Sequence, residues 1–124
     1  MYKDEEGKRQ VEEFIKKSHH KIKKKFDFMV KMVAEEKNFL KEPYVKHFSV
    51  ERYKKLYELR LKAASTMIRI IYFEMNGDII LLHAFHKKDN RDTEQALEYS
   101  LKIVEKIDSQ SLIINDFFEE VPIR

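Results

Sequence analysis

Residues 67–86 read MIRIIYFEMNGDIILLHAFH, and this stretch decides the fold. Its two halves are rich in Ile, Phe and Tyr, residue types that β-strands favour. Between them lies Asn76-Gly77, the dipeptide with the strongest preference for two-residue hairpin turns. The stretch therefore predicts an antiparallel hairpin of strands 67–75 and 79–86.

The residues before this hairpin extend the sheet. Residues 56–62 are also β-rich, and a short connection around Ala64-Ser65 pairs them with 67–73. A two-residue loop there places Arg60 directly opposite Arg69. Because side chains alternate along a strand, one face becomes almost wholly apolar, and we expect the helices to cover it. That face comprises Tyr57, Leu59, Leu61, Ile68, Ile70, Tyr72, Leu81 and Phe85.

The opposite face of the predicted sheet gathers charge. An uninterrupted hairpin register places His86 opposite Met67, on the same face as Arg69. Like charges directly across a strand pair are destabilising, so Arg60 opposite Arg69 requires an anion. Glu58 can supply part of that negative charge and a bound phosphate the rest. The alternative is that the guanidinium groups point into solvent or pair only with carboxylates of the protein.

The two histidines of the last strand are predicted to differ in role. His86 lies on the cationic face, where an imidazole with a pKa near ~6.5 can act as general acid or base. His83 falls among apolar side chains and is interpreted as a core histidine. We find no Gly-rich phosphate loop, nucleophile elbow or metalloprotease helix, and we expect no metal and no cofactor. Metal-free RNA cleavage needs only a base, an acid and cations, which Arg60, Lys62, Arg69 and His86 provide, although phosphate binding alone fits them equally.

The rest of the chain is expected to be largely helical, which makes the fold class α+β. Apolar residues recur at steps of three and four in two regions before and one region after the strands. One long helix is the alternative for the first two regions, and Asp92 is the expected cap of the last helix. The expected elements are helices 8–18, 20–36 and 92–107, an irregular segment 37–55, and an apolar, acidic tail 109–124 whose role stays open.

Composition sets the broad class of the protein. A length of 124 residues with 43% hydrophobic residues suits one domain spanning 1–124. The absence of Cys excludes disulfides and thiol catalysis, and the absence of a signal peptide or long apolar run favours a soluble, cytoplasmic protein without membrane contact. Residues 1–88 hold 21 Lys/Arg against 13 Asp/Glu, whereas residues 89–124 hold 4 against 9. A basic body favours a polyanionic partner, with a merely solubilising surface as the alternative.

The sequence resembles the phage-derived HigB-like branch of the RelE/ParE toxin superfamily. The matching stretches, in order, are Glu42-Pro43-Tyr44-Val45-Lys46-His47, Tyr57-Glu58-Leu59-Arg60-Leu61, Ile68-Arg69-Ile70-Ile71-Tyr72-Phe73 and Leu81-Leu82-His83-Ala84-Phe85-His86-Lys87-Lys88. The resemblance implies two N-terminal helices packed on a twisted antiparallel sheet, with a C-terminal helix. It also implies a ribosome-dependent endoribonuclease that cuts mRNA, and a helix-turn-helix antitoxin of the HigA kind as partner.

The resemblance also implies which residues act. Arg60, Arg69 and His86 are the expected catalytic residues, and four lysines are expected to bind the RNA phosphates. Family members usually begin with a full strand ahead of the position of Phe14, and the few residues ahead of it here lead us to expect a short edge strand or a truncated start. A ParE-like gyrase inhibitor and a catalytically inactive binding module remain as alternatives. Three of these lysines match family functional positions, Lys62, Lys87 and Lys88, and the fourth, Lys46, is expected to reach RNA from the loop before the first strand.

Overall fold

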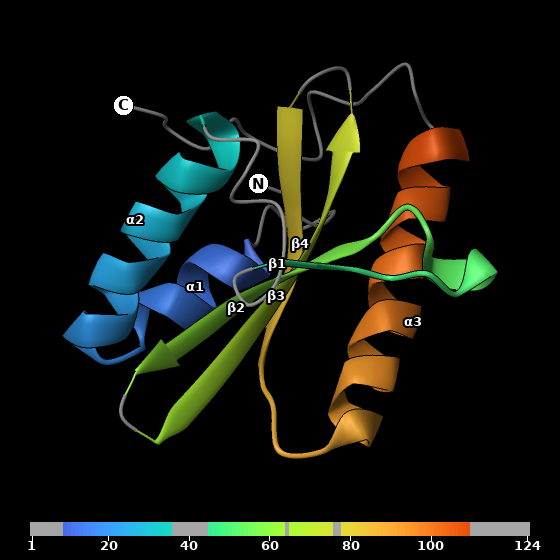
Figure 1. Cartoon of the computed structure of the whole chain (residues 1–124). Helices are drawn as coiled ribbons and strands as arrows, with labels where there is room; N and C mark the ends of the chain where they lie inside the picture. The colour runs from blue at the N-terminus through green and yellow to red at the C-terminus, as the bar shows by residue number, and fades with distance from the viewer. Residues whose placement is uncertain (1–8, 36–44, 64, 76–77, 110–124) are drawn as a thin grey trace.

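The computed structural model describes residues 9–35, 45–63, 65–75 and 78–109. Four antiparallel strands form one sheet in the order β1-β2-β3-β4, with helices on both of its faces (Figure 1). The α+β class is thereby confirmed. The elements are α1 (Gln10–Lys16), α2 (His20–Glu35), β1 (Val45–His47), the short 3-10 helix η2 (Glu51–Tyr53), β2 (Tyr57–Ala63), β3 (Thr66–Met75), β4 (Asp78–His86) and α3 (Asn90–Ser109).

The helix and strand bounds follow most of the predictions. Two separate helices precede the sheet, as preferred over one long helix, and β2, β3 and β4 lie where the β-rich runs predicted them. The segment 37–55 is not wholly irregular, because its residues 45–47 form β1 on the outer edge of β2. The predicted tail falls almost entirely on residues 110–124, which lie outside the described residues. No helix within the described ranges is long and apolar enough to cross a membrane.

The register of β2 with β3 is confirmed, and Arg60 lies directly opposite Arg69. The β3–β4 hairpin keeps its predicted register from the turn as far as Tyr72 opposite Leu81. A β-bulge then shifts the register between Ile71 and Tyr72. Beyond the bulge every residue of β4 is displaced by one position relative to the predicted pairing.

The bulge exchanges the two faces for the end of β4, because a shift of one residue turns each side chain to the other side. Arg69 lies opposite Phe85, not the expected Ala84. His83 lies opposite Ile71, on the charged face, and His86 pairs with Ile68 on the apolar face. The predicted faces of Phe85, His83 and His86 were therefore wrong.

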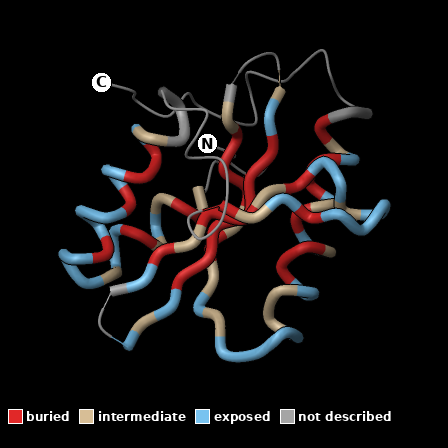
Figure 2. Tube along the Cα trace, in the orientation of Figure 1, coloured by how far each residue is buried: buried red, intermediate tan, exposed pale blue. Residues whose placement is uncertain are grey.

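One hydrophobic core lies between the sheet and the pair α1 and α2 (Figures 1 and 2). It contains most of the face that the sequence predicted as apolar, and Tyr57 packs on its margin. Ala84 takes the place that Phe85 was expected to fill, as the shifted register requires. The buried strand residues of this core are Val45, Leu59, Leu61, Ile68, Ile70, Tyr72, Leu81 and Ala84.

A second core lies on the other face of the sheet, under α3 (Figure 1). The apolar stripe of α3 packs on the half of this face nearest the β3–β4 turn, so this face is only partly open. Its strand residues are Ile71, Phe73, Ile80 and Leu82, and its α3 residues are Ala96, Leu97, Ile103, Val104 and Ile107. The charged residues occupy the remaining half of the face.

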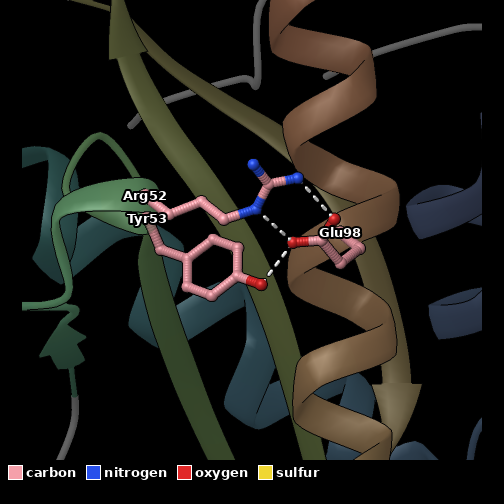
Figure 3. Close-up of polar contacts among 3 residues, drawn as sticks. All are labelled: Arg52, Tyr53 and Glu98. Carbon is pink, nitrogen blue, oxygen red and sulfur yellow. Dashed lines mark hydrogen bonds and ion pairs between the residues drawn. The ribbon is translucent and has the colours of Figure 1, made fainter.

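Polar contacts determine where α3 begins and how η2 attaches to it. Asp89 accepts hydrogen bonds from the backbone N–H groups of Arg91 and Asp92, and Asp92 accepts from those of Lys88 and Asp89. This reciprocal arrangement is a capping box, so Asp89 is the cap where Asp92 was expected. Further along α3, the Glu98 carboxylate accepts two hydrogen bonds from the Arg52 guanidinium, each 2.7 Å, and one from Tyr53 Oη (Figure 3).

A side chain of α1 completes the outer edge of β4. Gln10 Nε2 donates to the Ala84 carbonyl, and the Ala84 N–H donates to Gln10 Oε1, both at 2.8 Å. One amide group thus forms the two hydrogen bonds that a neighbouring strand would form at Ala84. This contact also joins α1 to the edge of the sheet.

Candidate functional site

Five of the seven predicted site residues belong to the same face of the sheet. Arg60 and Lys62 of β2 share this face with Arg69 of β3, by the β2–β3 register. Lys46 pairs with Glu58 across β1 and β2 and so lies on this face as well. The Lys87 N–H donates to the Met67 carbonyl at 2.9 Å, which extends the β3–β4 ladder by one residue. Alternation along the extended strand then places Lys87 with Arg69.

The centre of this charged face is an ion cluster of two arginines and one carboxylate. Glu58 Oε1 lies 3.1 Å from Arg60 Nε, which donates a hydrogen bond to it, and 3.5 Å from Arg69 Nε. The side chains of Glu58 and Arg69 are 1% and 8% exposed, whereas that of Arg60 is 24% exposed. Glu58 therefore neutralises one of two guanidinium groups that face each other across β2 and β3, and one positive charge remains.

Burial leaves this cluster with hydrogen-bonding capacity unused. Among the described residues, Arg69 Nε and Glu58 Oε2 are buried without a hydrogen-bond partner, and Arg69 Nη1 donates to the Ile68 carbonyl at 3.3 Å. Burial lowers the pKa of Arg69 from its ordinary value. The negative charge of Glu58 acts against this lowering, and the positive charge of Arg60 lowers the pKa further. Two guanidinium groups with spare donors and excess charge suit a phosphate oxyanion.

His83 is a residue of this face that the sequence reasoning assigned to the core. Its ring centroid lies 4.7 Å from that of Tyr99 on α3 and 6.3 Å from that of Phe85. Burial lowers its pKa below the ordinary value, because the charged imidazolium form is poorly solvated there. No glycine marks the bulge at Leu82-His83, so the residue pattern contained no signal for this placement.

The two remaining predicted residues lie at the end of β4. The His86 ring packs on Phe14 of α1, with centroids 4.8 Å apart, which follows from its pairing with Ile68. Its position at the strand end lets it border cavities on both sides of the sheet. Lys88 is exposed in the connection to α3. The structure thus places Arg60, Arg69, Lys46, Lys62 and Lys87 on one face, which His83 shares by register and His86 does not.

Acidic and imidazole side chains of the described residues do not gather into a metal site. Across the described ranges, no three His, Asp or Glu side chains are placed to hold a metal ion together. On the charged face, the carboxylate of Glu58 lies near the arginines and pairs with them. A cationic face of this composition binds anions, and its rows of lysine and arginine suit a polyanion with regularly spaced phosphates.

The fold and the site define a small α+β protein with a single antiparallel sheet and a cationic face. Its residues 13–105 match the model of a protein family described as Phage derived protein Gp49-like (DUF891). The chain belongs to this Gp49-like family, which is RelE-like and is associated with the toxins of toxin–antitoxin pairs. A toxin of this kind has an antitoxin partner in general. Neither the curated proteins nor the solved structures contain a match.

Proposed function

We propose that this protein is a HigB-like toxin that cleaves mRNA on the ribosome. One observation carries the proposal. Arg60 and Arg69 lie directly opposite each other, and both of their guanidinium groups contact one buried carboxylate, that of Glu58. Such a cluster retains positive charge at a preorganised place, which is what a phosphorane transition state requires. The helices α1 and α2 on one face and cations on the other also match the RelE-like arrangement that the sequence resemblance implies.

In the proposed reaction, a phosphate of the mRNA lies against Arg60 and Arg69. The ribose 2′-oxygen attacks the adjacent phosphorus while a base accepts its proton, and the guanidinium groups stabilise the charge on the phosphoryl oxygens. The bond to the 5′-oxygen breaks, and an acid protonates that oxygen. The products are a 2′,3′-cyclic phosphate and a 5′-hydroxyl end. His83 is the imidazole that the register places on this face, and His86 is the one that the sequence predicted for this role.

The lysines of the charged face contribute binding in this proposal. Lys46, Lys62 and Lys87 share the face, and Lys88 follows it in the chain. They contact neighbouring phosphates of the mRNA, so affinity should fall as salt rises. A HigA-like helix-turn-helix protein is the proposed antitoxin, and the cytoplasm, where mRNA is translated, is the proposed location.

The test adds the purified protein to ribosomes that translate a defined mRNA. Cleavage within the codon in the ribosomal A site, with a cyclic phosphate end, supports the proposal. Intact mRNA together with gyrase-dependent DNA breaks supports a gyrase inhibitor. Intact mRNA without such DNA breaks supports an inactive binding module. Arg60→Gln should slow cleavage about 100-fold or more, since it removes one charge stabiliser. Arg91→Gln, at an exposed arginine of α3, is the matched control and should cleave at the wild-type rate.

A further inference from the structure

A cavity of about 280 Å³ lies beside the charged face, between the end of β4 and the first half of α3. Four ring side chains border it, those of His83, Phe85, His86 and Tyr99, together with the side chains of Gln95 and Asp92. Phe85 is the direct cross-strand partner of Arg69, so the cavity adjoins the arginine cluster. The size approaches the lower limit of small-ligand pockets, about 300 Å³.

We propose that this cavity receives one unpaired nucleobase of a single-stranded RNA whose phosphate lies on the neighbouring arginines. The inference rests on the proposed function and names the part of the RNA that the protein recognises besides the backbone. Proteins that bind single-stranded RNA stack bases on aromatic side chains, and this cavity offers Phe85 and Tyr99 with the imidazoles of His83 and His86.

Tyr99 is more exposed than Phe85 or His83. It is 49% exposed although it contacts the His83 ring, with centroids 4.7 Å apart and planes tilted by 49°. A large exposed ring at the border of a cavity provides a flat surface on which a base can stack. The bulge in β4 is what turns His83 towards Tyr99, so the same local irregularity creates the cavity and the imidazole of the charged face.

The polar groups of the cavity favour a base over a phosphate. The Asp92 carboxylate would repel a phosphate, but it accepts hydrogen bonds from N–H groups, such as those on the edge of a base. The Gln95 amide both donates and accepts, which suits the mixed edges of nucleobases. His83 Nδ1 is buried and has no hydrogen-bond partner within the described part of the chain, so a ligand can supply one.

The test measures the affinity of the protein for two short 2′-O-methyl oligoribonucleotides, which lack the attacking hydroxyl and stay intact. One has all its bases, and the other has the same backbone with abasic positions. The wild-type protein should bind the first about 10-fold or more tightly than the second. Tyr99→Ala should abolish this difference by weakening binding of the first alone, and Tyr99→Phe should preserve it because the ring remains.

The matched control is Phe28→Ala on α2, since Phe28 is 51% exposed and belongs to the helix layer on the opposite face. It should change neither affinity. Equal binding of both oligonucleotides by the wild type, no binding of either, or equal weakening of both by Tyr99→Ala overturns the nucleobase pocket. The ribosome assay separates the two proposals, because base-dependent binding without cleavage refutes only the proposed function. Cleavage without base-dependent binding refutes only the pocket.

Discussion

Replacing Glu58 with Gln removes the one negative charge between two guanidinium groups while preserving the shape of the side chain. The carboxylate oxygen lies 3.1 Å from Arg60 Nε and 3.5 Å from Arg69 Nε. At an effective dielectric constant near 20, each attraction is worth roughly 5 kcal/mol before desolvation is subtracted. Breaking buried ion pairs costs about 3–5 kcal/mol in practice. Because Arg60 is 24% exposed and water screens its charge, we expect the lower end, about 3 kcal/mol.

Urea unfolding of Glu58→Gln measures this loss, which should also lower Tm by roughly 10 °C in a domain of this size. Glu105→Gln, at an exposed carboxylate of α3, is the control and should stay within about 0.5 kcal/mol of the wild type. The double variant Glu58→Gln with Arg69→Met should recover much of the loss, because it also removes a buried charge. Inorganic phosphate should stabilise Glu58→Gln more than the wild type. If Glu58→Gln unfolds at the wild-type urea concentration, the carboxylate does not hold the cluster together and the reasoning is refuted.

Three further changes test other contacts. The hydrogen bonds from Arg52 and Tyr53 lower the pKa of Glu98 from 4.5 to about 2, so this contact stabilises the fold above pH 4.5 and is lost as pH falls towards 2. The difference in Tm between the wild type and Glu98→Gln should therefore shrink across that range. Burial lowers the pKa of His83, so as pH falls the imidazole takes up a proton in the unfolded chain before it does so in the folded protein. Stability should therefore fall below about pH 6.5, and His83→Asn should reduce this dependence of the unfolding free energy on pH in urea titrations. Gln10→Ala should cost about 1–2 kcal/mol and accelerate hydrogen exchange of the Ala84 amide, whereas unchanged exchange would contradict the edge contact.

Regular alternation made the centre of the site predictable from the residues. The short loop between β2 and β3 leaves one register in which the apolar side chains share a face, and that register sets Arg60 opposite Arg69. The Asn76-Gly77 dipeptide likewise predicted the pairing of Met75 with Asp78 that the structure shows. Where pairing follows an unbroken period of two, the sequence was sufficient to place side chains on a face.

Three features were beyond this reasoning for physical reasons. The bulge falls between Leu81 and His83, where no glycine signals it, and the neighbouring residues Leu81 and Leu82 pack into the cores on opposite faces of the sheet. β1 has only three residues, and its strand conformation depends on pairing with β2 rather than on local preference. The apolar stripe of α3 predicted that the helix packs against the sheet, but it did not indicate which of the two faces the helix covers. The nucleobase cavity needs both the bulge and α3, so it was not predictable either.

In the described part of the chain, the edge of β4 at Ala84 is occupied by a rotatable side chain, Gln10, and not by another strand. A change of side-chain rotamer frees both main-chain groups without any unfolding of the sheet. An extended peptide from a binding partner can then add to this edge by β-augmentation, which requires main-chain groups and little sequence specificity. An unoccupied strand edge is a template for edge-to-edge association, and Gln10 occupies the main-chain groups of Ala84 at this edge.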